Sequence, residues 1–424
     1  METQKLFNRN LVIITLGQII SLFGSAILRF AIPLHILKIT GSPAIFGMVL
    51  ALSFLPVIVL SFVGGILADR LNKRNIMVVL DFITAGVIVF LLLSLESLPI
   101  VPLCIVAMMI LFGISGIYQP TVQATIPSIV EGDNILKATA IVNQISSLSG
   151  LIGPIIGGVL YGGFGLYPIL IISTICYIFS AIMQMFIKIT HVKQDNSIGV
   201  IQIVKTDFSI SKNYMVNKKP IILKIILLIS IFNLLFTAVI IVGNPILIVN
   251  TLKLKDSMLG FAEGAFAVGG LCGGIFTALL GHKIKLSKSY ISLILCAVLV
   301  GIIGVPIIIG ASPYASYTTI LVCGFLIMML TSFISIKLMS TVQMETPKEL
   351  VGKIIACMMS LAMCTMPLGQ ALYGYLFEVF SSNVYIVLFI ASAGSMIIAI
   401  MAKYIFKDID TEKVIEESKG TSIS

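Results

Sequence analysis

Long apolar segments alternate with short polar breaks along the whole chain. Windows of about 20 residues, cut where charges or Pro and Gly cluster, predict twelve membrane-spanning helices. The first six are expected at 11–37, 42–67, 76–95, 100–118, 139–161 and 167–187, and the next six at 221–250, 257–280, 289–309, 315–336, 353–377 and 384–406. The pattern therefore predicts an all-α membrane protein.

The long polar stretch at 188–219 separates two sets of six spans. It predicts an N-terminal six-helix bundle at 1–187, a cytoplasmic linker at 188–219, a C-terminal six-helix bundle at 220–406 and a cytoplasmic tail at 407–424. Within the linker, Ile201, Val204, Phe208 and Met215 recur near helical spacing among lysines. An amphipathic helix on the inner leaflet and a flexible tether explain this spacing equally well.

Short sequences recur at corresponding places in the two sets of spans. TVQATIP at 121–127 returns as TVQMETP at 341–347, LYG at 160–162 returns at 372–374, and GGI at 64–66 returns at 273–275. Offsets near half the length predict a duplicated unit, with two pseudo-symmetric six-helix bundles.

Composition and charge fit a protein that lies in the lipid bilayer. The chain is 58% hydrophobic and 11% charged, against about 25% charged in soluble domains. The net charge of +9 could suggest nucleic acid, but the basic residues lie between apolar runs. Lys38, Lys253 and Lys255 fall in loops of one side, Arg29 and Lys224 lie within spans, and all other Lys and Arg fall on the opposite side. Because cytoplasmic loops carry the excess, we expect a multi-pass cell-membrane protein with both termini cytoplasmic and no nucleic-acid partner.

The segment GGILADRLNKR, from Gly64 to Arg74, lies at the inner end of the second span and in the loop that follows. It resembles the GxLADRxGRK signature of the major facilitator superfamily, in the position where that family has it. Asn72 stands where the family has glycine, and we expect Asn72 to tolerate the left-handed turn that glycine would supply. Gly65 is expected to permit close helix approach, and the basic pair Lys73 and Arg74 to lie near membrane phosphates.

This resemblance implies an inner gate formed by Asp69, Arg70 and Asp81, which closes when the transporter faces outward. Asp81 lies about two turns into the third span, and we expect it to meet Arg70 because an unpaired carboxylate there would be costly. Positive-inside topology alone would explain the basic residues of the loop, but not the two aspartates.

The fifth span contains a second motif, formed by Gly153, Pro154, Gly157 and Gly158 after Ser149. It resembles the GxxxGPxxGG signature of exporters in this superfamily, with Ser149 replacing the first glycine. Glycines at this spacing let helices approach closely and proline bends the helix, although generic small-residue packing is an alternative. Together with YQPTVQATIPSIV and LGQIISLFGSAILRFAIPL, the motif resembles the macrolide-efflux and enterobactin (siderophore) exporter branch of the drug:proton antiporters.

Two polar stripes mark a candidate substrate cavity between the halves. They comprise Gln18, Ser21, Ser25 and Arg29 in the first span and Asn233, Thr237 and Asn244 in the seventh. At 100° per residue the stripes cover arcs of about 80° and about 40°. Bonding of Ser and Thr to their own backbone explains single residues better than it explains two matched stripes.

Glu263 is the candidate proton carrier, since it lies two turns inside the eighth span. The alternatives are a structural bridge from Glu263 to Arg29, or hydration near the outer interface. Many proton-driven exporters of the superfamily carry an arginine inside the fourth span, and FGISGIYQP has none, so proton coupling does not follow from the resemblance alone.

These features predict a secondary active transporter that exports amphipathic organic compounds, of the drug, macrolide or siderophore kind, in exchange for protons. We expect no cofactor, because no GxxxxGK[ST] loop occurs, and no metal, because the seven cysteines lie in apolar runs without a CxxC motif. We also expect a monomer whose partners are the substrate, protons and the lipid bilayer. Lipid flipping or metabolite uptake by the same fold is the alternative. A membrane enzyme is less favoured because no cluster of catalytic residues occurs, and a receptor because it need not show a duplicated half.

Overall fold

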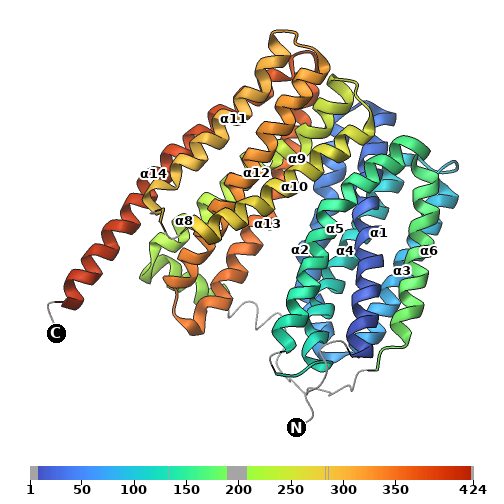
Figure 1. Ribbon diagram of the computed structural model, residues 1–424, viewed down its shortest axis with the longest axis horizontal. Helices are drawn as coiled ribbons and strands as arrows, with labels where there is room; N and C mark the ends of the chain where they lie inside the picture. The colour runs from blue at the N-terminus through green and yellow to red at the C-terminus, as the bar shows by residue number, and fades with distance from the viewer. Residues whose placement is uncertain (1–7, 133, 189–207, 282, 285, 422–424) are drawn as a thin grey trace. The chain divides into compact units, whose positions relative to one another are not determined.

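The computed structural model describes residues 8–421 except 133, 189–207, 282 and 285. Twelve helical segments in the described part of the chain are long and apolar enough to cross a membrane. They match the twelve predicted spans, with ends that differ by several residues, and the all-α fold is confirmed (Figure 1). The long α14, Tyr385–Thr421, continues well beyond the predicted end of the last span.

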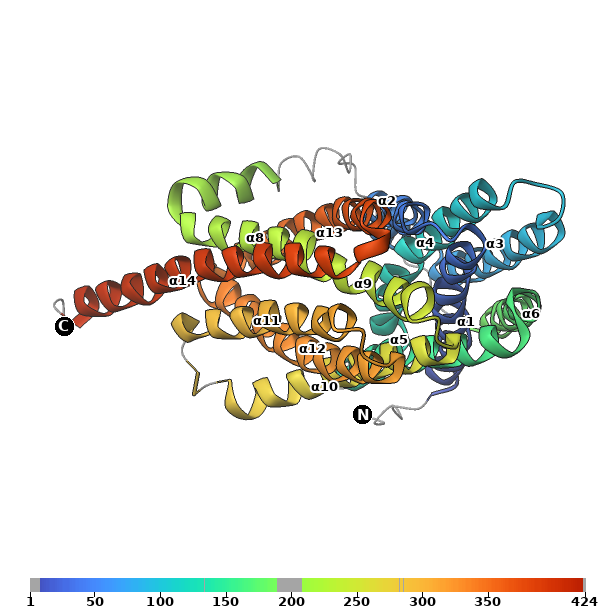
Figure 2. The ribbon, with the colours of Figure 1, turned by 90° about the horizontal axis from the view of Figure 1, so that it is seen from above.

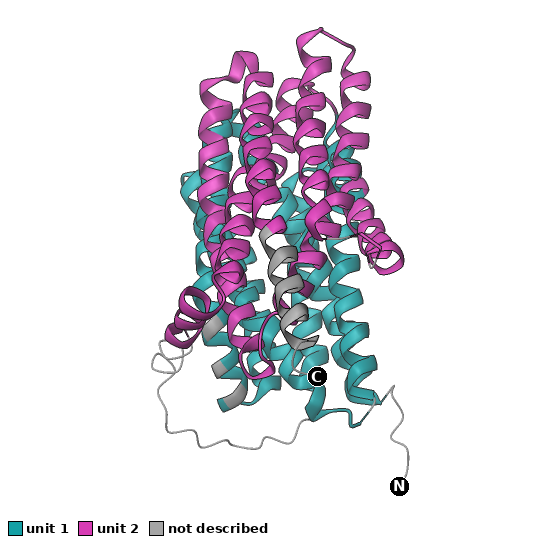
Figure 3. Cartoon of the chain, turned by 90° about the vertical axis from the view of Figure 1, so that its left-hand side faces the viewer, with its two compact units in different colours: residues 1–197, 255–264 teal, residues 198–254, 265–424 magenta. Residues whose placement is uncertain are grey.

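The chain divides into two compact units, residues 1–197 with 255–264 and residues 198–254 with 265–424 (Figure 3). The first unit contains α1 (Arg9–Thr40), α2 (Pro43–Arg70), α3 (Lys73–Ser94), α4 (Ile100–Thr125), α5 (Asn134–Phe164), α6 (Leu166–Met185) and the first turns of α10 (Asp256–Leu280). The second contains the rest of α10, α8 (Pro220–Phe232), α9 (Ala238–Pro245), α11 (Tyr290–Ile308), α12 (Pro313–Met344), α13 (Lys348–Val379) and α14.

The same local chemistry starts one helix in each unit. Gly41 ends α1 with φ 65°, Ser42 caps the amide of Ile45, and Pro43 begins α2. In the second unit Gly310 has φ 63°, and Ser312 caps the first turn of α12, which begins at Pro313. Glycine accepts the left-handed turn, serine satisfies a free amide, and proline at the first helical position needs no amide donor.

Glycines also let helices cross closely in both units. A side chain at Gly64 of α2 would collide with the backbone of Gly116 and Ile117 in α4. The repeated glycine, Gly273 of α10, meets the carbonyl of Met329 in α12 in the same way. The GGI repeat read from the sequence therefore corresponds to a repeated helix contact.

The seventh span is less regular than a single α-helix. Two π-helical segments, Asn233–Thr237 and Ile246–Thr251, interrupt it on either side of α9. Such π-bulges are rare and occur frequently at functional sites.

Part of the linker is helical. Residues 208–213 form a helix that continues as a π-helix at Tyr214–Lys218, and Met215 is buried in the core of the second unit. Ile201 and Val204 lie outside the described residues, while Phe208 is exposed. The choice between a membrane-surface helix and a tether stays a prediction.

Candidate functional site

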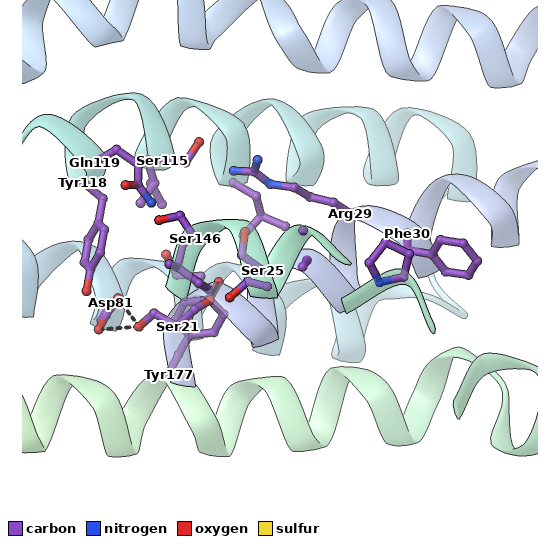
Figure 4. Close-up of a pocket in the computed structure, with 18 of the residues that line it drawn as sticks. Ser21, Ser25, Arg29, Phe30, Asp81, Ser115, Tyr118, Gln119, Ser146 and Tyr177 are labelled. Atoms are coloured by element: carbon purple, nitrogen blue, oxygen red, sulfur yellow. Dashed lines mark hydrogen bonds between the residues drawn. The ribbon is translucent and has the colours of Figure 1, made fainter. Parts of the chain in front are cut away.

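A cavity of about 470 Å³ lies in the first unit, among α1, α3, α4, α5, α6 and the start of α10 (Figure 4). Its wall combines apolar side chains with many hydroxyl and amide groups. Its ionisable and polar lining residues include Ser21, Ser25, Arg29, Asp81, Thr84, Ser115, Tyr118, Gln119, Ser146, Ser149, Tyr177 and Glu263. Figure 4 shows Asp81 and Tyr118 toward one end of this space and Phe30 toward the other.

The polar stripe of α1 contributes three of its four members to the cavity. Ser21, Ser25 and Arg29 line it, because they follow one another at helical spacing on one face. Gln18 is fully buried and does not line it, although it belongs to the same predicted stripe. Its amide atoms have no hydrogen-bond partner among the described residues.

Arg29 lies over the ring of Phe112. Its guanidinium carbon is 4.1 Å from the centroid of the Phe112 ring, which is a cation–π distance. The buried Nε atom has no hydrogen-bond partner in the described part of the chain. Glu263 lines the same cavity. The alternative of a structural bridge from Glu263 to Arg29 stays a prediction.

Asp81 is bound inside the first unit by neutral groups, and its expected contact with Arg70 is wrong. Its side chain is 2% exposed, and its carboxylate accepts hydrogen bonds from Ser21 Oγ at 3.1 Å, Ser180 Oγ at 2.7 Å and Gln184 Nε2 at 2.9 Å. Arg70 is exposed at the end of α2, whereas Asp81 lies on the face of α3 that packs toward α1 and α6. Figures 1 and 2 show α1, α3 and α6 in the same bundle.

Further groups on α4 and α6 extend this cluster. Gln184 Nε2 lies 2.8 Å from the hydroxyl of Tyr118, and the hydroxyl of Tyr177 donates to the carbonyl of Ser21 at 3.1 Å. These residues are not among the predicted site residues, although the sequence contains a signal for those on α6. Ser173, Tyr177, Ser180 and Gln184 follow one another at spacings of four, three and four, which marks one polar face on the sixth span.

The loop between α2 and α3 departs from two expectations. Asn72 has φ −65°, so it is not left-handed; instead its side chain caps the amides of Arg74 and Asn75 at the start of α3. A side chain at Gly65 would meet nothing within 4 Å, so the close helix approach belongs to Gly64 and not to Gly65. The phase of the helix decides which of two adjacent glycines faces its neighbour.

Of the remaining gate residues near this loop, the structure describes the side chains of Lys73 and Arg74 but not that of Asp69. Asp69 lies in the last turn of α2. Lys73 begins α3, and the guanidinium of Arg74 bonds with Asn75 and with the carbonyl of Met185 at the end of α6. The gate assigned by resemblance stays a prediction.

The glycine motif of α5 makes two different helix contacts. A side chain at Gly153 would collide with Ala26 of α1, and one at Gly157 would lie 3.1 Å from the ring of Phe30. A side chain at Gly158 would lie 3.0 Å from the Cα of Gly260 in the first turns of α10. Pro154, between these glycines, lines the cavity. The motif thus sets how closely α5 packs against two helices.

A polar cluster joins α1, α5 and the start of α10 within the first unit. Lys38 Nζ lies 2.8 Å from Asp256 Oδ2, and His35 Nδ1 lies 2.9 Å from the hydroxyl of Tyr161. The aspartate side chain is nearly buried, whereas that of the lysine is 43% exposed. His35 is therefore part of a helix contact near the ends of these helices.

The polar stripe of the seventh span lines a separate cavity in the second unit. Asn233 and Thr237, which hydrogen-bond to each other at 3.0 Å, contribute to a space of about 310 Å³. The lining residues of this cavity carry no charge. Asn244 is buried and does not contribute.

Twelve apolar helices, a duplicated unit and an interior cavity with ionisable side chains define a membrane transporter for small molecules. Residues 14–357 match the sequence profile of the Major Facilitator Superfamily, and the chain belongs to this family. It is a transporter rather than an enzyme.

Two curated relatives are both called macrolide efflux protein A. The protein from Streptococcus pyogenes is 23% identical over 361 residues, which covers 84% of this chain and 86% of the relative. The protein from Enterococcus faecalis is 22% identical over 334 residues, which covers 78% of this chain and 99% of the relative.

Solved structures with the same fold include the nucleoside transporter NupG and a D-xylose–proton symporter. The first has a TM-score of 0.70 at 14% identity, covering 94% of this chain and 98% of that chain. The second has a TM-score of 0.67 at 12% identity, covering 92% of this chain and 96% of that chain. At these identities the likeness shows the fold alone.

Proposed function

We propose that this protein exports amphipathic organic compounds across the cell membrane by alternating access, in exchange for protons. The observation that carries the proposal is the cavity of the first unit, which combines an apolar wall with hydroxyl groups, one arginine and two carboxyl groups. A mostly apolar cavity with a few polar groups suits an amphipathic ligand. Transport needs a gradient, since the sequence contains no nucleotide-binding loop.

Two features favour export over uptake. The relatives that share most of the chain's length are named as macrolide efflux proteins. The exporter-type glycines of α5 contact α1 and α10 closely, through Gly153, Gly157 and Gly158. Close contacts of this kind favour two alternative packings of rigid helices over gradual deformation.

Arg29 is the residue we expect to bind a polar group of the substrate. Its guanidinium is supported by Phe112, and its Nε hydrogen is not used by any described residue. Neighbouring hydroxyls of Ser115 and Ser146 already donate to carbonyls of their own helices, so they offer acceptor sites to a ligand.

The test measures the accumulation of a dye, a macrolide and a siderophore in cells with and without the protein. Export predicts lower accumulation of at least one compound in cells that contain the protein. A Gly158→Leu variant, expressed to the same level, supplies the inactive control because the added side chain meets the backbone of α10. Equal accumulation of all three compounds would contradict export.

The direction of transport separates export from the alternative of lipid flipping or metabolite uptake. Oriented vesicles loaded with the compound that passes the first test would report it. Net movement toward the cytoplasmic side would favour uptake, and movement of labelled lipid alone would favour flipping.

A further inference from the structure

The cluster around Asp81 has the composition of a proton-binding site. Its carboxylate is buried, yet the groups that hold it, Ser21, Ser180 and Gln184, are neutral. Asp81 forms no ion pair with any described lysine, arginine or histidine. A buried carboxylate without a cation is costly, and protonation removes that cost. We propose that Asp81 binds the proton that this transporter exchanges for its substrate, an inference that rests on the proton-coupled export proposed above.

The distances within the cluster favour a proton over a metal cation. Ser180 Oγ lies 2.7 Å from Asp81 Oδ2 and 2.8 Å from Ser21 Oγ, which are hydrogen-bond distances. A sodium ion would have to separate these oxygens in order to coordinate them, whereas a proton fits between them as they are. The oxygens come from α1, α3 and α6, so their convergence is a property of the folded bundle.

Gln184 provides a way for the cluster to respond to the proton. Its Nε2 atom has three acceptors within hydrogen-bond distance, Asp81, Tyr118 and Ser180, but an amide nitrogen has only two hydrogens. Its buried Oε1 atom has no partner among the described residues. When Asp81 is protonated, its carboxyl O–H becomes a donor, and a turned amide would present Oε1 to it and to the Tyr118 hydroxyl. Protonation would then reverse the hydrogen bonds that join α3, α4 and α6.

The cavity gives the proton access to this cluster. Asp81, Ser21 and Tyr118 all line it, so the carboxyl group is reached from the space where the substrate binds. The ionisable groups that face the same space are Arg29 from α1, Tyr118 from α4, Tyr177 from α6 and Glu263 from α10. Arg29 is the cation among these lining residues, and it contacts Phe112.

Infrared difference spectroscopy on the full-length protein in lipid nanodiscs tests the assignment without a substrate. Titration from about pH 5 to about pH 9, a range that covers documented buried carboxyls, should show one carbonyl band of a buried carboxylic acid. The band should be lost in Asp81→Asn and retained in Glu263→Gln. Ser180→Ala removes a donor to the carboxylate, so the midpoint should move up by about one pH unit. Ser173→Ala, a buried serine of the same helix without a bond to Asp81, should leave it unchanged.

Three results would overturn the assignment. The band could persist in Asp81→Asn, or, if that variant does not fold, Ser180→Ala could leave the midpoint in place. Replacing choline by sodium in the buffer could also abolish the band, which would make the cluster a sodium site.

Proteoliposomes with ethidium as the probe separate this inference from the proposed function. Asp81→Asn should keep downhill ethidium movement and lose its acceleration by a pH gradient. Full acceleration in Asp81→Asn would contradict the assignment of the exchanged proton. Absence of ethidium movement in the wild-type protein as well would count against the proposed function, while the infrared titration would still decide whether Asp81 binds a proton.

Discussion

Single residues in the first unit show that burial depth and charge do not by themselves assign a role. Asp81 and Glu263 both line the cavity, but Asp81 is enclosed by three neutral donors whereas Glu263 is only partly buried. The guanidinium of Arg29 lies over the face of Phe112. The local partners of each group, rather than its position along a span, therefore determine what it can bind.

Glu263 supports a prediction at this scale. Glu263→Gln removes a group that can carry a proton while keeping the shape of the side chain. Because we assign the exchanged proton to Asp81, we expect pH-driven transport in proteoliposomes to persist in Glu263→Gln, and substrate binding to change by less than about threefold, since a conservative polar change costs within about 0.5 kcal/mol. Glu378→Gln, an exposed glutamate at the end of α13, is the matched control. Loss of pH-driven transport in Glu263→Gln would contradict the assignment to Asp81 and would make Glu263 the carrier of the exchanged proton.

At the scale of helices, the glycine motif of α5 decides how close its neighbours lie. Gly153 and Gly157 face α1, whereas Gly158 faces Gly260 at the start of α10. Adjacent residues of one helix point in different directions, so a short motif serves two interfaces.

Gly158→Leu should disturb the contact between α5 and α10. The added side chain meets the backbone of Gly260, and overpacking of this kind costs about 1–3 kcal/mol. We expect a lower Tm in detergent and loss of transport. Gly163→Leu on the same helix is the control, because a side chain there would meet nothing within 4 Å. An equal fall in Tm for both variants would show that helix propensity, and not packing, is responsible.

The ion pair between Lys38 and Asp256 also belongs to this scale. It joins α1 to α10 at the end predicted to face outward, with the aspartate nearly buried. Asp256→Asn should loosen this contact. We expect labelling of a Ser25→Cys reporter from outside to increase about fivefold, because the ion pair contributes about 1 kcal/mol to the closed state of this end. Exchanging the charges, Lys38→Asp with Asp256→Lys, should restore most of the protection. Failure of the exchanged pair to do so would argue against an ionic latch.

For the whole molecule, the proposed alternating access requires that closure at one end alternate with closure at the other. The loop between α2 and α3 carries the residues that family resemblance assigns to the inner closure, and Asp81 is not among those that meet Arg70. The proposed gate therefore depends on Asp69, Arg70 and the basic pair after Asn72.

Asp69→Asn tests this gate. The change should leave folding and membrane insertion intact, because the residue lies at the last turn of α2 near the predicted water interface. We expect labelling of a Ser146→Cys reporter from the cytoplasmic side to rise about fivefold, which corresponds to a loss of about 1 kcal/mol from the free energy that favours the closed inner gate. Glu131→Gln, an exposed residue, is the control. Unchanged labelling together with full transport would remove Asp69 from the mechanism.

The sequence by itself determined the spans, the duplication and the fold class. These properties depend on the length of apolar runs and on residues that are neighbours in the chain, such as the Gly-Ser-Pro turn before α2. It also placed Ser21, Ser25 and Arg29 on one face, because helical phase within a single span follows from spacing.

Tertiary structure alone decided which side chains meet. The sequence pattern predicted a contact between Asp81 and Arg70, whereas in the folded bundle Asp81 bonds with Ser21, Ser180 and Gln184. It also predicted the close helix approach at Gly65, whereas the approach occurs at Gly64. Residues 60 to 103 positions apart in the chain bond in this cluster. Their meeting depends on how three helices rotate and pack, and each rotation is set by contacts with several neighbours at once. No local pattern contains that information, so the candidate proton site emerged only from the packed helices.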